Sequence, residues 1–369
     1  MRVVIVGAGI GGMAAARGLL ADGHEVTVLE RASELRTLGG AITLWANGTT
    51  ILSDLGVDIG GLGERLTGIS TLTASGRVAV SIDLAEADTR LGSGAVVTPR
   101  ADLLRAIAHG LPDGLVRFGS RFASLGDGDT VVTESGEVHE ADLLIGADGV
   151  GSAVRAALYG TAPRPETGVA SWQGLIPSPV DLGSTALIMM GREGYVGLSP
   201  AGNGQAQWFC DTPWPAPEGD PLTVLSDRYG HWGTPVPELF KTLSEVDVRP
   251  YPHHRHGIRW GRGRAILLGD AAHAMPPSMA LGANQALEDV WVLRNALRTN
   301  PATALARYGV TRQSRAAFAG RVATRSMAVA GPQTFFQREG LLRGAGSVPT
   351  RVLNSAFAGL HRRISNRLG

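Results

Sequence analysis

Hydrophobic residues at the start of the chain follow the pattern of a strand, a helix and a second strand. Residues 3–6 are apolar and end at a glycine, which is typical of a strand buried on both faces of a parallel sheet. Residues 10–21 are rich in alanine and leucine and predict a helix, with Gly23 as its stop signal. A second apolar run over residues 26–29 ends at Glu30. The first 30 residues therefore predict a βαβ unit.

The rest of the chain changes pattern twice. Residues 69–97 alternate short apolar runs with Gly, Ser and Asp, which favours antiparallel strands. Between residues 163 and 257 lie 13 of the 20 prolines, and this shift in composition marks a second, sheet-rich domain. Further buried strands are predicted at 140–146 and 265–268, and helices at 101–109, at 285–297 and in the tail from residue 331.

Composition excludes several classes of protein. The chain has 369 residues and a formal net charge of +1, which does not suggest a nucleic-acid partner. Lys241 is the only lysine and lies in no glycine-rich loop, which excludes a P-loop ATPase. Cys210 is the only cysteine, so an intrachain disulfide and a thiolate zinc site are impossible. The early glycines argue against a signal peptide, and no glycine-poor apolar run of membrane-spanning length follows, so we expect a soluble, cytoplasmic protein without a membrane partner.

The turn between the first predicted strand and helix carries a dinucleotide-binding pattern. Gly7, Gly9 and Gly12 form a G-x-G-x-x-G, in which the first glycine permits a tight turn and the second lets the backbone approach a pyrophosphate at the helix N-terminus. Glu30 follows at the end of the second strand. A carboxylate there accepts hydrogen bonds from a ribose 2′-hydroxyl and repels a 2′-phosphate. The pattern predicts bound FAD or NAD, not NADP.

Two more glycine–aspartate pairs follow predicted strands. Asp148-Gly149 comes after a buried strand, and Ser152 is placed to cap the next helix. Gly269-Asp270 ends another strand, which places Asp270 to bind a polyol hydroxyl. A proline pair then leads to a helix that opens at Gly282, and its N-terminus can stabilise negative charge.

These three motifs, in this order and spacing, resemble the single-component class A flavoprotein monooxygenases, the aromatic hydroxylase family. The resemblance covers roughly residues 1–50, 97–156 and 258–330. It implies that the first glycines and Glu30 hold the ADP half of FAD, that Asp270 contacts the ribityl chain, and that Arg100 lies near the flavin phosphates. The cofactor-binding candidates are Gly7, Gly9, Gly11, Gly12, Glu30, Arg31, Arg36, Arg100, Asp148, Gly149, Asp270, Gly282, Ala283 and Asn284.

The resemblance also implies a fold class: α/β, with a Rossmann-type FAD-binding domain, an inserted sheet-rich substrate domain and C-terminal helices. The FAD-binding domain is predicted over residues 1–68, 98–162 and 258–330, the substrate domain over 69–97 and 163–257, and a helical segment over 331–369. Either a monomer or a homodimer is compatible with the sequence.

The implied reaction is hydroxylation of an aromatic or enolic small molecule. Tightly bound FAD takes hydride from NADH or NADPH, reacts with O2 and transfers oxygen as a C4a-hydroperoxide. No second dinucleotide fingerprint exists, so NAD(P)H is expected to bind transiently, with Asp148 and Arg155 as candidates. The cofactor carries the chemistry, so no catalytic residue is assigned. Candidates for lining the substrate pocket are Trp172, Tyr195, Trp208, Pro276 and Pro277.

Other interpretations stay open. The protein could be an FAD-dependent oxidoreductase that does not insert oxygen, or a low-turnover accessory that holds an unstable intermediate. His273 could act as a base, although a histidine at a strand–loop junction more often bonds to backbone. The histidines at 253, 254 and 256 have no acidic neighbour, so no metal site is expected. Ala280 and Ala41 stand where the family usually has glycine, beside the expected flavin ring.

Overall fold

The N-terminal βαβ unit forms the centre of a six-stranded sheet. In the computed structural model, which describes the chain except residues 36–38, 128–129, 164–165, 244–249, 329–343 and 345, the strand order is β18-β19-β12-β1-β2-β8. The pairs from β19 to β8 are all parallel and only β18 runs antiparallel. The strands are β1 (Arg2–Val6), β2 (Glu25–Leu29), β8 (Val116–Arg117), β12 (Leu143–Gly146), β18 (Gly261–Arg262) and β19 (Ala265–Leu267).

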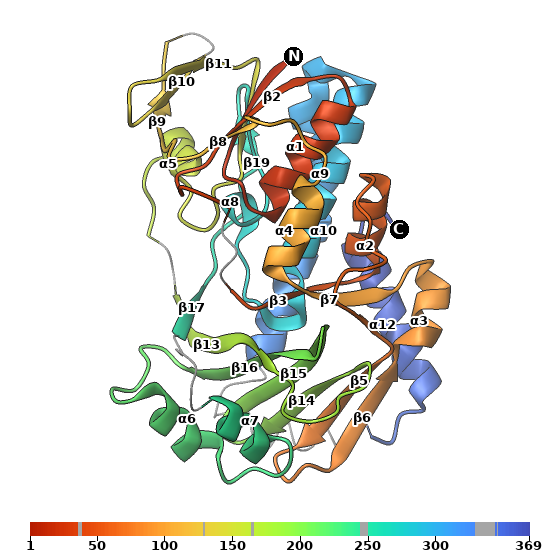
Figure 1. Cartoon of the computed structure of the whole chain (residues 1–369). Helices are drawn as coiled ribbons and strands as arrows, with labels where there is room; N and C mark the ends of the chain where they lie inside the picture. Colours follow the sequence, from red (N-terminus) through yellow and green to blue (C-terminus); the bar gives the residue numbers. More distant parts are fainter. Residues whose placement is uncertain (36–38, 128–129, 164–165, 244–249, 329–343, 345) are drawn as a thin grey trace.

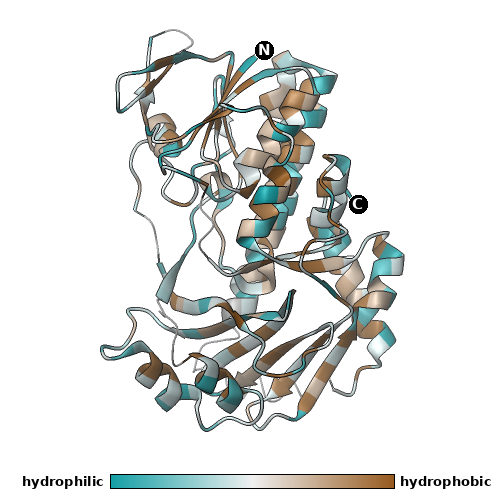
Figure 2. Cartoon of the chain, in the orientation of Figure 1, coloured by the Kyte–Doolittle hydropathy of each residue, from teal (hydrophilic) through white to brown (hydrophobic). Residues whose placement is uncertain are grey.

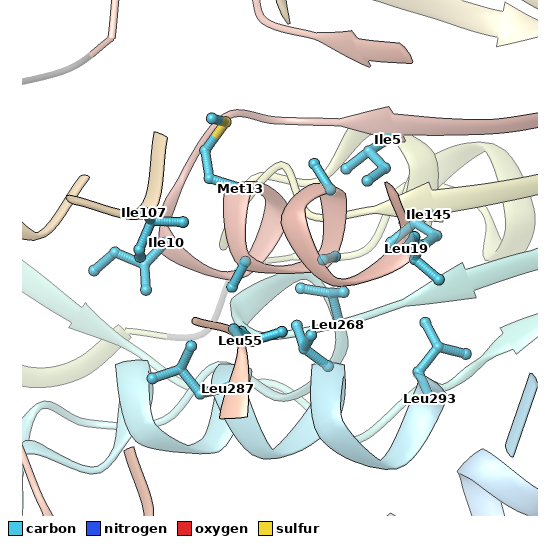
Figure 3. Packing of buried hydrophobic residues seen from close by; sticks show 14 of the residues in the cluster. Ile5, Ile10, Met13, Leu19, Leu55, Ile107, Ile145, Leu268, Leu287 and Leu293 are labelled. Carbon is cyan, nitrogen blue, oxygen red and sulfur yellow. The ribbon is translucent and has the colours of Figure 1, made fainter. Parts of the chain in front are cut away.

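Helices cover this parallel sheet and bury its apolar side chains. Helix α1 (Ile10–Ala21) lies between β1 and α9 (Gly282–Thr299), as Figure 3 shows. Gly18 permits this close packing, because a Cβ there would lie 2.5 Å from Cδ of Arg294 on α9. Figure 2 shows hydrophobic and hydrophilic segments mixed along the central helices. The other helices of this lobe are α2 (Ala46–Asp54), α4 (Arg100–Ala108), α5 (Ala153–Tyr159), α8 (Asp270–His273) and α10 (Ala304–Ala328).

A seven-stranded sheet forms the second lobe, in the order β17-β13-β16-β15-β14-β5-β6. All its pairs are antiparallel except β14 with β5. Helices α6 (Pro221–Tyr229) and α7 (Val236–Leu243) lie on one face, and the other face turns toward the first lobe (Figure 1). The strands are β5 (Gly68–Thr73), β6 (Val78–Asp83), β13 (Glu166–Pro177), β14 (Thr185–Gly191), β15 (Gly194–Gly202), β16 (Gln205–Pro213) and β17 (Pro250–His254).

Two small sheets and further helices complete the fold. One sheet has the order β3-β7-β4 and runs between the lobes, and the other has the order β11-β10-β9. A one-turn helix, η1, precedes α9, and η2 follows it. The bounds are β3 (Ala41–Leu44), β4 (Glu64–Leu66), β7 (Ala95–Pro99), β9 (Phe122–Leu125), β10 (Thr130–Thr133), β11 (Val138–Glu140), α3 (Leu84–Leu91), η1 (Ser278–Ala280), η2 (Pro301–Thr303) and α12 (Thr350–Ile364).

The predicted antiparallel strands of residues 69–97 are found only in part. Strands β5 and β6 pair as expected, but residues 84–91 form helix α3. Asp83 caps this helix by accepting a hydrogen bond from the Glu86 N–H, and Gly92 ends it in a left-handed conformation. The fold class is α/β as predicted, with the FAD-type lobe, the substrate-type sheet and C-terminal helix α12.

Candidate cofactor and substrate site

The glycines of the first turn serve two different purposes. A Cβ at Gly7 would lie 2.5 Å from the carbonyl oxygen of Ala147, and one at Gly12 would collide with the carbonyl oxygen of Gly7. Packing within the protein therefore explains both. Gly9 begins α1 with an ordinary φ of −75°, and a Cβ there would meet nothing within 4 Å. Only a ligand that approaches the backbone gives Gly9 a reason to be glycine.

Gly11 is explained by packing, because its Cβ would lie 2.7 Å from Cδ1 of Leu268. Glu30 lies next to this turn at the end of β2. Its carboxylate accepts hydrogen bonds from the backbone N–H groups of Ala8, at 2.8 Å, and Ala32, at 2.9 Å. These bonds hold the acid at the mouth of the first turn, where a ribose hydroxyl of a dinucleotide would lie.

Of the two arginines predicted near the cofactor after Glu30, Arg31 is exposed, and Arg36 lies outside the described residues.

Asp148 acts as a cap within the second motif. Its carboxylate accepts hydrogen bonds from the Ser152 hydroxyl at 2.5 Å and from the Ala153 N–H at 2.6 Å. Burial raises the pKa of Asp148, although these bonds act in the opposite direction. Ser152 caps α5 as predicted, with its hydroxyl accepting from the Arg155 N–H at 2.9 Å. Gly149 has a φ of 79°, which favours glycine.

Asp270, the first residue of α8, presents its carboxylate to solvent. Protein atoms nevertheless surround it closely enough that desolvation raises its pKa. Asp270 can be reached by solvent and yet has many protein atoms around it, so its side chain faces a recess of the molecule. Among the described residues, no hydrogen bond to this carboxylate is present, so it is available to a ligand hydroxyl. The positive charge of Arg100, the first residue of α4, opposes the pKa increase.

A buried polar cluster fixes the loop that carries Asp270. The carboxylate of Asp289, on α9, accepts from the Gly269 N–H at 2.8 Å and lies 2.6 Å from Nε2 of His273. Its other oxygen accepts from Nε of Arg312, on α10, at 2.6 Å. Burial alone would raise the pKa of Asp289, but the charges of His273 and Arg312 outweigh it and lower the pKa. His273 is thus held on its acidic partner, and Asp289 and Arg312 are site residues that the sequence analysis missed.

The N-terminus of α9 lies beside the loop after the proline pair. Gly282 begins the helix, and a Cβ there would meet nothing within 4 Å, as at Gly9. The Asn284 side chain is buried, accepts from the Trp45 N–H at 2.9 Å and donates to the Thr43 carbonyl at 2.9 Å. It ties β3 to α9. Ala283 is half-buried, Pro276 is buried and Pro277 is exposed.

Ala280 adopts a conformation that normally belongs to glycine. Its φ is 51°, and that of the preceding Met279 is 67°. Two consecutive left-handed residues other than glycine are strained, and such strain is stored at functional sites. Ala280, which stands where the family usually has glycine, thus holds a backbone conformation that favours glycine.

The predicted pocket residues do not share one face of the large sheet. Trp172 and Trp208 are buried in one cluster with Leu225 of α6 and Leu239 of α7, so they point away from the first lobe. Tyr195 adjoins Val196, a member of that cluster, and therefore points to the opposite face. Successive side chains of a strand point to opposite faces of the sheet, so the position along the strand decides which face a side chain occupies. Residue type alone could not reveal this.

Gln207 links the two lobes. Its side-chain oxygen accepts a hydrogen bond from the Ala41 N–H, at the start of β3. A Cβ at Gly40 would collide with the same amide, and the Gly40 carbonyl accepts from the Arg100 N–H at 3.2 Å. The face of β16 that carries Gln207 therefore looks toward the expected flavin site. Nothing in the local sequence pattern indicates this contact.

The described residues contain no His, Cys, Asp or Glu group arranged to hold a metal ion. Within the same part of the chain, no helix is both long enough and apolar enough to cross a membrane.

Comparisons with known proteins match this geometry. A family described as "FAD binding domain" matches residues 1–325. The aurachin C monooxygenase/isomerase of Stigmatella aurantiaca is 33% identical over 332 residues, covering 86% of each chain. The FAD-dependent urate hydroxylase of Klebsiella pneumoniae is 33% identical over 340 residues, covering 85% of this chain and 86% of the relative.

Solved structures agree with the sequence relatives. The crystal structure of Klebsiella pneumoniae HpxO complexed with FAD and uric acid superposes with a TM-score of 0.91 at 28% identity, covering 98% of this chain and 97% of that chain. The fold and the comparisons thus define an FAD-dependent flavoprotein, and the open backbone at Gly9 and Gly282 is compatible with a bound cofactor. The chain belongs to the family of FAD-dependent flavoprotein monooxygenases.

Proposed function

We propose that the protein uses NAD(P)H and O2 to hydroxylate an aromatic or heteroaromatic small molecule that carries an acidic O–H or N–H group. The observation that supports this most strongly is the sheet face that turns toward the first lobe, because it carries the polar side chains of Ser171, Gln207 and Asp211 among apolar ones, while the opposite face packs under α6 and α7. The relatives act on compounds of this class, including urate and 3-amino-4-hydroxybenzoate.

The chain offers a consistent set of contacts to FAD. The backbone at Gly9 would hold the pyrophosphate, Glu30 a ribose hydroxyl and Asp270 the ribityl chain. The helix N-terminus at Gly282 would stabilise negative charge on the reduced ring. The chemistry that FAD supplies when bound is hydride acceptance and transfer of one oxygen atom of O2, by the route that the family resemblance implies.

Arg155 is the proposed contact to NAD(P)H, together with Asp148. Its guanidinium donates to the carbonyl oxygens of Ala271 at 3.1 Å and Gly257 at 2.8 Å, and burial lowers its pKa. It therefore also supports α8. Stopped-flow reduction of wild type and Arg155→Ala, with and without an aromatic ligand, tests the contact to NAD(P)H. We expect reduction to be faster with an aromatic ligand present, and the variant to need more NAD(P)H. A variant with unchanged dependence on NAD(P)H removes Arg155 from cofactor binding.

Oxygen labelling tests the reaction itself. FAD-loaded protein is incubated with NAD(P)H, ¹⁸O2 and a panel containing uric acid and 3-amino-4-hydroxybenzoate. Incorporation of one ¹⁸O atom into product supports the proposal. Oxidised product without label favours an FAD-dependent oxidoreductase that does not insert oxygen. Binding of ligand without NAD(P)H consumption across the panel favours an accessory protein that holds an unstable intermediate.

A further inference from the structure

Three polar side chains from separate strands meet on the large sheet. The hydroxyl of Ser171, on β13, donates to Oδ1 of Asp211, on β16, at 2.5 Å. The same hydroxyl lies 2.8 Å from Nε2 of His253, on β17. Ser171 is 5% exposed and His253 is 4% exposed, whereas Asp211 is partly exposed. The cluster therefore has two buried members and one member that a small molecule can reach.

The cluster lies on the face that turns toward the first lobe. Ser171 and Leu175 share one face of β13, and Leu175 packs in a cluster with Met279 and Leu281 of the loop after the proline pair. On β16, Asp211 shares its face with Gln207, which bonds to Ala41. The neighbouring residues of opposite parity, Trp172 and Cys210, pack under α6 and α7.

The chain beyond β17 connects this cluster to the Asp270 loop. Three residues after His253, the His256 N–H donates to the Ala274 carbonyl at 3.4 Å, directly after α8. Three extended residues span at most about 10 Å. The cluster and the loop that carries Asp270 are therefore neighbours across the space between the lobes.

The surroundings of Asp211 prepare its carboxyl group to exchange a proton near neutral pH. Burial raises its pKa to about 6, and the Ser171 hydrogen bond opposes part of this increase. Burial lowers the pKa of His253 to about 4, with a smaller effect of His254, so His253 is neutral at pH 7. Tyr195 of β15 shares the face of Asp211, and from α6 the Tyr229 hydroxyl donates to the Asp211 backbone carbonyl.

One oxygen of Asp211 is available. Oδ1 accepts from Ser171, but within the described part of the chain Oδ2 has no hydrogen-bond partner. Asp211 is partly exposed, so a small molecule can reach this oxygen. Ser171 and, through it, His253 fix the other oxygen, which leaves Oδ2 as the atom that can receive a ligand.

We propose that Asp211 is the catalytic residue that binds the acidic O–H or N–H group of the substrate and accepts its proton, and that Ser171 and His253 position it. This inference rests on the proposed function and assigns to Asp211 the contact with the substrate in that reaction. The proton passes from the substrate to Oδ2, and the electron pair of the broken bond stays on the ring system. Ser171 goes on donating its hydrogen bond to Oδ1, which still accepts when Oδ2 carries the proton.

The test measures both binding and turnover with FAD-loaded protein between pH 5 and 8. The probes are uric acid, 3-amino-4-hydroxybenzoate and the 4-methoxy analogue of the latter, which lacks the hydroxyl proton. Wild type is compared with Asp211→Asn, Ser171→Ala and the control Glu218→Gln, which removes an exposed carboxylate of the same lobe. Binding is followed by the change in flavin absorbance, and turnover by kcat/KM with whichever probe is oxygenated.

We expect wild type to bind the hydroxyl compound more tightly than its methoxy analogue above pH 6, and to lose this preference as Asp211 is protonated. Asp211→Asn abolishes the preference and lowers kcat/KM by about 10²- to 10⁴-fold. Ser171→Ala moves the midpoint to higher pH, because it removes a bond that stabilises the carboxylate, whereas a purely structural serine would leave the midpoint unchanged. Glu218→Gln behaves as wild type.

The proposal is overturned if Asp211→Asn keeps the preference, if Ser171→Ala leaves the midpoint in place, or if wild type binds none of the acidic probes. Failure of the proposed function gives a different result. In that case the preference and its pH midpoint are present in wild type, but no ¹⁸O enters any probe.

Discussion

Single residues show which features of the site serve a ligand and which serve the fold. Gly9 and Gly12 belong to the same motif, but only Gly12 is required by contacts within the protein. Asp211 presents the same contrast among acids, because its burial penalises the charged form without full compensation from hydrogen bonds. Both residues are less favourable for the isolated fold than an ordinary choice would be, which is expected where function decides the residue.

Gly9→Val is expected to abolish FAD binding and leave the apoprotein folded. Its Cβ meets no protein atom within 4 Å, so the valine fills only the space needed by the pyrophosphate. The matched control is Gly12→Val, whose side chain collides with the Gly7 carbonyl and costs about 1–3 kcal/mol of stability by overpacking. Absorbance of bound FAD and urea denaturation of the apoproteins separate the two effects. Stoichiometric FAD in Gly9→Val would show that the phosphate site lies elsewhere.

Asp211→Asn is expected to stabilise the protein above pH 6. The pKa of Asp211 rises from 3.8 to about 6 on folding, so the folded state binds more protons than the unfolded state between these values. Wild-type stability therefore falls as pH rises through this window, by about 3 kcal/mol for two pKa units. The asparagine variant lacks this loss. The check is urea denaturation of both proteins from pH 4 to 8, and a difference that does not vary with pH would contradict it.

At the scale of elements, the polar cluster of α8, α9 and α10 replaces ordinary apolar packing under the cofactor loop. Asp289 connects the Gly269 backbone to His273 and Arg312, and both Asp289 and Arg312 are fully buried. Three elements are thus held in one arrangement by a single carboxylate. The position of Asp270, at the start of α8, depends on that arrangement.

Asp289→Asn is therefore expected to cost about 3–5 kcal/mol of stability, because it leaves the Arg312 charge buried without its partner. FAD affinity should fall with it. The control is Arg298→Met at the end of the same helix, which breaks a half-exposed ion pair with Asp22 and costs less than about 1 kcal/mol. Urea denaturation of the apoproteins measures both. A cost below about 1 kcal/mol in Asp289→Asn would show that the cluster does not hold α8.

Local sequence pattern predicts some elements well and others not at all. The strand β1, the helix α1 and the caps at Gly23 and Ser152 follow from neighbouring residues, and the structure has them. Helix α3 was predictable too, because Leu84, Ala87 and Leu91 have helical spacing and Asp83 precedes Glu86 as a cap, but the surrounding Gly, Ser and Asp residues favoured strands and turns. The motif glycines were predictable because their spacing between a strand and a helix forms a local pattern, although Gly7 and Gly11 pack against distant residues, Ala147 and Leu268.

The side chains that face the substrate region were not predictable. Trp172 and Trp208 are pocket candidates because they lie in the sheet-rich domain, but a period of two residues decides the face, and it buries both under α6 and α7. The contact of Gln207 with Ala41 joins residues 166 positions apart. Ser171, Asp211 and His253 come from three strands whose order follows only from the folded sheet.

At the scale of the whole molecule, contacts such as that of Gln207 with Ala41 hold the two lobes against each other. The Gln207 amide is buried where the large sheet meets the loop before β3, and it receives the Ala41 N–H across the gap. This contact helps to hold the sheet face that carries Gln207 against the backbone beside the expected flavin ring. We expect oxygen transfer to depend on it more than FAD binding does, because the proposed FAD contacts lie on the first lobe.

Gln207→Ala is therefore expected to leave FAD affinity within about twofold and to uncouple the reaction. Loss of the hydrogen bond costs about 0.5–1.5 kcal/mol of stability, while more of the NAD(P)H consumed ends as hydrogen peroxide because the substrate is held less closely to the site of oxygen transfer. The measurements are FAD titration of apoprotein and the ratio of hydroxylated product to NAD(P)H oxidised. Gln205→Ala is the matched control, since Gln205 lies at the start of the same strand and forms no side-chain hydrogen bond within the described chain. Equal coupling in both variants would show that the lobes are held by other contacts, and a large loss of FAD from Gln207→Ala would show that the sheet itself helps to hold the cofactor.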